Sequence, residues 1–166
     1  MSASMDSGAR MSIDGVYRWL LWRRWDPKLP TMTFVMLNPS TADEREDDPT
    51  IRRCIGFAKR EGCGEIVVVN LFAFRTPEPK DLTYAIARGV DPWGERQADT
   101  MNGVLLNAHA PNLLVAAWGA HRVAEKAMDK VPERLPWLCL GTTKDGHPRH
   151  PLYVKGDQPL VSWSKP

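Results

Sequence analysis

The sequence predicts an α/β domain in three layers (α/β/α), with a central, mainly parallel four-stranded sheet. Two observations support this fold class: four short apolar runs that are typical of buried strands, and segments of helical periodicity between them. The apolar runs are residues 31–37, 66–73, 113–118 and 137–140. Each run has polar residues or glycine at or near its carboxyl end, where ligands bind in open α/β sheets. We therefore expect the functional site at that edge of the sheet.

Two segments precede the predicted core. Residues 1–12 are predicted to form a disordered tail, and residues 13–166 a single domain. Residues 17–25 are rich in aromatic side chains and arginine, with apolar residues on both faces, which permits an edge strand or a short helix. We favour a strand that pairs with residues 31–37.

Helical segments are expected after the predicted strands. Asp47-Asp48-Pro49-Thr50 is a favourable helix start, because an aspartate can cap the helix and proline suits its first position. This helix would end at Gly62. Further helices are expected over residues 91–109 and 121–131. The C-terminal segment is expected to wrap the domain in an extended form, anchored by Tyr153, Leu160 and Trp163.

The composition is that of an ordinary soluble globular protein, with 43% hydrophobic and 25% charged residues and a net charge of +2. Basic residues gather in local clusters that suit either a polyanion or a solvated surface. The N-terminal residues lack the apolar core of a signal peptide, and no run approaches the ~18 apolar residues of a membrane span. We expect a cytoplasmic monomer that does not contact a membrane.

The cysteines and histidines argue against a metal centre. The three cysteines include no Cys-x-x-Cys pair, and the four histidines lack zinc-finger spacing. The cysteines are predicted to be reduced thiols. We expect neither a metal ion nor another cofactor.

Asn38, Pro39 and Ser40 directly follow the first predicted strand. Asn-Pro is a common turn dipeptide, but its position after a buried strand favours a functional role. Asn38 is expected to hold a water molecule or a substrate carbonyl. The nearest possible bases are Asp43, Asp47 and Asp48.

Asn70 interrupts an apolar run, where an amide without partners is costly. Such an amide can bond to neighbouring backbone. It can also present its donor and acceptor to the polar edge of a planar ligand such as a nucleobase. We favour the second interpretation.

A proline-stiffened loop after the last predicted strand carries His147 and His150. Either histidine can donate to developing negative charge or titrate near neutral pH, and the alternative is an ordinary surface loop. Phe72, Trp118 and Gly119 lie near the same strand ends. An aromatic ring there can stack on a base, although core packing is the better interpretation for Phe72.

Taken together, these residues resemble the motifs of the uracil-DNA glycosylase superfamily. Its members have a strand ending in a Gly-x-Asn-Pro type motif, a second strand with a base-pairing asparagine, and a late His-Pro-x-Pro-Leu type loop. Residues 36–40, Asn70 and residues 147–152 resemble these three motifs, and residues 118–120 resemble a glycine turn. Two departures are visible. Methionine and leucine replace the glycine-containing start of the first motif, and the late loop has one extra residue unless His150 is its histidine.

The chain also looks like a member of an uncharacterised bacterial and phage family. The signature of that family includes Met-Leu-Asn-Pro-Ser-Thr-Ala-Asp and Asp-Asp-Pro-Thr-Ile-Arg-Arg-Cys. It occupies residues 36–43, 47–54 and 70–72 of this sequence.

The superfamily resemblance implies a uracil-DNA-glycosylase-like fold and a metal-independent DNA N-glycosylase. Such an enzyme flips a modified or damaged base, here expected to be a pyrimidine, into a pocket and hydrolyses its N-glycosidic bond. Occurrence in bacteria and phages suggests defence against phages with modified DNA. The alternatives are an enzyme that processes nucleotides or nucleosides and a catalytically inert nucleic-acid-binding protein with the same fold.

On this interpretation the site residues form three groups. The catalytic candidates are Asn38, Asp43, His147 and His150. The substrate-binding candidates are Pro39, Ser40, Asn70, Phe72, Trp118 and Gly119. The candidates for contact with DNA are Arg52, Arg53, Lys144 and Arg149, with Leu152 as a wedge into the duplex.

Overall fold

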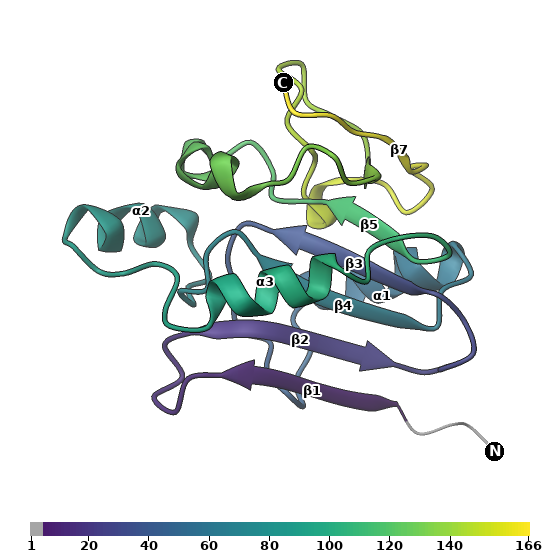
Figure 1. The fold of residues 1–166 in the computed structure, drawn as a ribbon, viewed down its shortest axis with the longest axis horizontal. Coiled ribbons are helices and arrows are strands. Elements are labelled where there is room, and N and C mark those ends of the chain that lie inside the picture. The colour runs from purple at the N-terminus through teal and green to yellow at the C-terminus, as the bar shows by residue number, and fades with distance from the viewer. Residues whose placement is uncertain (1–4) are drawn as a thin grey trace.

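A seven-stranded mixed sheet dominates the computed structural model, which describes residues 5–166 (Figure 1). The strand order is β1-β2-β4-β3-β5-β6-β7. The strands are β1 (Asp6–Met11), β2 (Arg18–Arg24), β3 (Thr31–Met36), β4 (Glu65–Asn70), β5 (Leu113–Ala116), β6 (Trp137–Cys139) and β7 (Val161–Ser162).

The four predicted strands form the parallel centre of this sheet. β4, β3, β5 and β6 pair in parallel, which confirms the predicted arrangement of these runs. β1, β2 and β7 extend the sheet with antiparallel pairs, so the predicted number of four strands was too low. The strands also end earlier than their apolar runs. β4, for example, ends at Asn70.

The first edge of the sheet contradicts two predictions. Residues 6–11 form β1 rather than a disordered tail, because β1 pairs with β2 and Gly8 leaves room for the ring of Trp22. β2 pairs with β1 and β4 rather than with residues 31–37, since β4 and β5 already occupy both edges of β3. Residues 1–4 of the predicted tail lie outside the described residues.

Helices connect the strands of the parallel centre, and a last short helix lies between β6 and β7. They are α1 (Pro49–Arg60), α2 (Pro79–Ala87), α3 (Gln97–Leu105) and the 3-10 helices η1 (Arg122–Lys130) and η2 (Pro151–Tyr153). α1 begins as its sequence predicts, with Pro49 in the first turn and Asp48 accepting a hydrogen bond from the N–H of Ile51 at 2.9 Å. This cap fixes the start of α1 beside the end of β3.

Two helix predictions need correction. The helix expected over residues 91–109 begins only at Gln97, because the carboxylate of Asp91 accepts the N–H groups of Trp93 and Gly94 in a preceding turn. The helix expected over residues 121–131 is a 3-10 helix, η1. α2 lies between these segments and β4, in a part of the chain for which no helix was predicted.

Helices cover both faces of the sheet, with α1 behind it and α3 in front in the view of Figure 1. Side chains alternate along β3 between two cores. Met32 and Phe34 join the core on the α1 side, whereas Val35 joins the core on the α3 side. The sheet is therefore the middle of three layers, as the sequence predicts.

The C-terminal segment is only partly anchored as predicted. Trp163 is buried, and Leu160 packs against the α1-side core. Tyr153 is 80% exposed, so its predicted role as an anchor was wrong. Its position on the short helix η2 turns its ring to the surface.

The strand order determines where a ligand can enter. From β3 the chain passes to β4 on one side and then returns to β5 on the other side. Ligands in open α/β sheets bind where the strand order reverses in this way, outside the carboxyl ends of the strands. In residues 5–166 no helix has the length and apolar character needed to cross a membrane.

Candidate functional site

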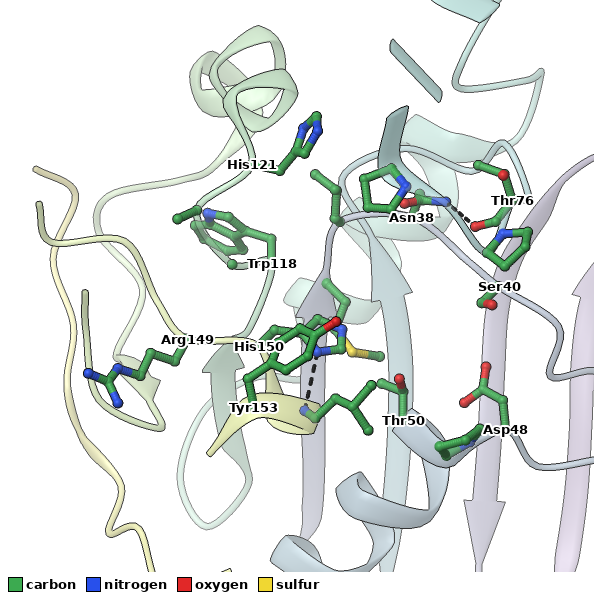
Figure 2. Close-up of a pocket in the computed structure, with 18 of the residues that line it drawn as sticks. Asn38, Ser40, Asp48, Thr50, Thr76, Trp118, His121, Arg149, His150 and Tyr153 are labelled. Atoms are coloured by element: carbon green, nitrogen blue, oxygen red, sulfur yellow. Dashed lines mark hydrogen bonds between the residues drawn. The ribbon is translucent and has the colours of Figure 1, made fainter. Parts of the chain in front are cut away.

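A pocket of about 770 Å³ opens at the carboxyl ends of β3 and β5 (Figure 2). Its walls come from the start of β2, the segment between β3 and α1, the first turn of α1, the segment from β4 into α2, the loop after β5, and the segment from β6 into η2. The pocket therefore lies at the reversal of the strand order. A volume of this size suits a small molecule or a single nucleotide.

Asn38 lines the pocket, and its amide orientation is fixed by backbone carbonyl groups. The Nδ2 atom donates to the carbonyl of Thr76 at 2.9 Å and to that of Pro39 at 3.1 Å. Figure 2 shows the amide nitrogen directed toward Thr76. The Oδ1 atom points away from these carbonyls, so it is able to accept a hydrogen bond from a water molecule or a substrate.

The acidic group of the pocket is Asp48 rather than Asp43. Asp48 is 8% exposed, lines the pocket and caps α1. Asp43 is not among the lining residues, and its carboxylate accepts the N–H groups of Arg45 and Glu46. The bonds with Glu46 and Arg45 hold the pKa of Asp43 below its usual value. The sequence identifies Asp48 only as one of three possible bases.

His150 enters the pocket, whereas His147 does not line it. The Nδ1 atom of His150 accepts the N–H of Leu152 at 3.2 Å, which requires the proton of the neutral ring to be on Nε2. Burial lowers the pKa of His150 to about 4, although the negative charge of Asp48 acts in the opposite direction. His150 is therefore a neutral imidazole at physiological pH and can donate from Nε2.

Trp118 and Gly119 form the wall beside His150. The ring of Trp118 is buried and meets the ring of Trp163 edge to face, with the centroids 5.0 Å apart. Gly119 has a φ of +77°, and a Cβ placed there would lie 3.6 Å from the Cβ of His150. The positive φ favours glycine, which allows the loop after β5 to approach His150 closely.

Two predicted substrate contacts, Asn70 and Phe72, do not line the pocket. Asn70 is buried, and neither atom of its side-chain amide has a hydrogen-bond partner in the described chain. It does not line the pocket, but its register partner Met36 does. Phe72 is buried in the α3-side core, where its ring stacks on that of Trp93 at 5.8 Å. The prediction that Phe72 contacts a substrate was wrong, and core packing was the better interpretation.

Two of the predicted basic residues lie at the rim of the pocket, and a third holds two helices together. Lys144 and Arg149 are exposed and line the pocket, and Arg149 donates to the carbonyl of Thr142 at 3.0 Å. Arg53 instead donates to carbonyl groups of Pro151 and Val154, which ties η2 to α1. Arg53 therefore supports the fold, and its contact with DNA stays a prediction.

The remaining predicted residues take three different positions. Ser40 lines the pocket, whereas Pro39 is buried and is not part of the lining. Arg52 is exposed, lies outside the pocket and donates to the carbonyl of Asp47. Leu152 lies at the rim with 39% of its surface exposed.

The pocket residues that the sequence analysis did not name as site residues include Arg18, Thr76 and His121. Arg18 begins β2, and it reaches the site because β2 runs antiparallel to β4 and starts where β4 ends. His121 comes shortly after the predicted third strand, following Trp118-Gly119-Ala120. Its position could therefore have identified it as a site residue. No local signal identified Arg18, since its position depends on the pairing of β2.

Residues 5–166 contain no cluster of potential metal ligands, and a family model matches most of the chain. Within residues 5–166, no group of three or more His, Cys, Asp or Glu side chains is arranged to hold a metal ion. A family model described as "Protein of unknown function (DUF1643)" matches residues 18–152. The three signature segments of the sequence lie within that range. No curated protein and no solved structure matches the chain.

Proposed function

This chain belongs to the DUF1643 family of proteins of unknown function, and we propose that it is a DNA N-glycosylase that excises a modified or damaged base. The base, expected to be a pyrimidine, would leave the duplex and enter the pocket between β3 and β5. Hydrolysis of the bond between the sugar and the base would follow there.

One observation carries this proposal: a neutral, donating imidazole and two oxygen acceptors face the same pocket. His150 comes from the loop after β6, and Asn38 and Asp48 come from the segment after β3. Breaking an N-glycosidic bond leaves negative charge on the base and positive charge on the sugar. The reaction therefore needs a donor at the base and an acceptor for the attacking water.

Each group has a defined part in the proposed reaction. The bond between C1′ and the base nitrogen breaks, and its electrons leave with the base. The Nε2–H of His150 donates to the departing base and stabilises its charge. Asn38 Oδ1 orients the water that adds to C1′, and the carboxylate of Asp48 stabilises the positive sugar and accepts the proton of that water. The released base anion then takes a proton from solvent.

The rim of the pocket favours DNA over a free nucleotide as the substrate. Lys144 and Arg149 present positive charge to solvent, and the apolar side chain of Leu152 is exposed beside them. Phosphates bind basic side chains, and an exposed apolar side chain can fill the space that a flipped base leaves. A free nucleotide makes no use of such a wedge.

Asn70 is proposed to recognise the base edge after a local rearrangement. Its amide has no partner in the described chain, so an occupant with a donor and an acceptor would satisfy it. Met36 lies beside it in β3 and lines the pocket. Methionine is flexible, and displacement of this side chain by a bound base would open the way to Asn70.

A search for a released base tests the proposed activity. The purified protein is incubated with genomic DNAs that differ in modification, including DNA from phages with modified pyrimidines, and mass spectrometry searches for a released base. We expect release from at least one modified DNA. Release from free nucleotides alone, with little dependence on salt, would favour a nucleotide-processing enzyme.

A further inference from the structure

Arg18 is a buried cation in the wall of the pocket. It is 2% exposed, and it lines the pocket together with Asp48. Its Nη1 atom donates to the carbonyl of Ala42 at 2.8 Å. Burial lowers its pKa to about 10, so the side chain keeps its charge at neutral pH.

The charge of Arg18 has no direct partner in the described chain. No carboxylate of residues 5–166 forms a salt bridge with it, and its buried Nε atom has no hydrogen-bond partner. Arg23, on the same strand, offers a comparison. It is 1% exposed, and its Nε atom forms an ion pair with Asp47 at 2.8 Å.

The surroundings of Arg18 do not remove its positive charge. Asp48 attracts it from a greater distance than a salt bridge, while the charges of Arg75 and Arg23 oppose it. Arg75 donates hydrogen bonds to carbonyl oxygens, among them those of Gly15 and Ser40. Carbonyl groups carry no net charge, so they do not neutralise the charge of Arg75. A buried guanidinium without a paired carboxylate is costly, and an anionic ligand would relieve that cost.

We propose that the pocket binds a base that carries an anionic substituent, such as a carboxylate, and that Arg18 holds this substituent. This inference rests on the proposed function and names its substrate class. Arg18 comes from β2, on the β4 side of β3, whereas Lys144 and Arg149 come from the loop after β6 on the opposite side. The rim cations are thus placed for the DNA phosphates, and Arg18 is placed for the base.

Isothermal titration with free bases tests this without requiring catalysis. The probes are 5-carboxyuracil and its neutral isostere 5-carbamoyluracil. We expect wild-type protein to bind the acid on the order of tenfold to a hundredfold more tightly, as charge-assisted hydrogen bonds do. Arg18→Met should remove this preference, and Arg18→Lys should keep part of it. The exposed Arg134→Met, outside the pocket, is the matched control and should keep all of it.

Several outcomes would overturn the inference. If wild-type protein binds 5-carboxyuracil and 5-carbamoyluracil equally tightly, the inference is wrong, even if Arg18→Met fails to fold. Absence of acid binding would also overturn it. Deoxyuridine and its 5′-monophosphate form a second pair of probes: Arg18-dependent preference for the phosphate alone would assign Arg18 to the nucleotide phosphate. If the acid binds through Arg18 but no DNA releases a base, the inference stands and the proposed function fails.

Discussion

The Nδ1 atom of His150 accepts the backbone N–H of Leu152 at 3.2 Å, and this bond starts the short helix η2 (Figure 2). The bond directs the imidazole into the pocket while Leu152 stays exposed at the rim. The start of η2 therefore presents both His150, the proposed donor to the departing base, and Leu152, the proposed wedge. Substitutions at these neighbouring positions should have different effects.

His150→Ala should slow base release by about a hundredfold to a thousandfold, since it removes a donor to the leaving group. DNA affinity should change little, because the contact strengthens mainly in the transition state. Single-turnover kinetics and a binding titration separate the two effects. His147→Ala is the matched control, because His147 lies on the same loop outside the pocket, and it should retain wild-type rates. Equal losses in both variants would contradict the assignment.

Arg149→Ala should weaken DNA binding and lower the dependence of log K on log salt by about one, as expected for the loss of one phosphate contact. The rate of base release from bound DNA should be nearly unchanged. Filter binding over a range of salt concentrations measures the slope. Arg96→Ala removes an exposed arginine outside the pocket and should leave the slope as it is.

Asn70→Leu should keep or increase the free energy of unfolding, by up to about 1 kcal/mol, because the amide that it removes is buried without partners in the described chain. The same change should abolish discrimination between bases, which a polar edge contact supplies at about 1–3 kcal/mol. Chemical denaturation and competition between substrates measure the two effects. A strongly destabilised variant would show that the amide has a structural role instead.

The lowered pKa of His150 should make the free energy of unfolding depend on pH. Its folded pKa is about 4 and the usual value is 6.5, so between these values the unfolded state binds more protons than the folded state. Stability should therefore fall as the pH drops from about 6.5 to about 4, by at most about 3 kcal/mol from this group. Denaturation of wild type and His150→Gln at several pH values isolates the contribution. An identical pH dependence in the variant would refute the depressed pKa.

The parallel centre and α1 could be predicted because their signals are local. Apolar runs of strand length alternate with helical segments, and Asp48 with Pro49 marks a helix start. β1 could not be predicted, since its polar residues become a strand only by pairing with β2. The position of Arg18 likewise depends on the antiparallel pairing of β2 with β4.

The candidate site was predictable in part for the same reason. Asn38, Trp118 and His150 follow parallel strands, and the carboxyl ends of such strands share one edge of the sheet. Phe72 also follows a strand, but its side chain faces the α3-side core. The sequence did not show that Asp48 rather than Asp43 lines the pocket, because both lie in one acidic loop and the cap geometry of α1 distinguishes them.

The ratio of released base to newly formed abasic sites tests the proposed glycosylase activity most directly. The substrate is a modified DNA from which wild-type protein releases a base, and mass spectrometry follows both products. We predict one abasic site for each base released, and severe loss of both products in His150→Ala. Failure to release a base from any modified DNA, or equal release by His150→Ala, would contradict the proposed mechanism.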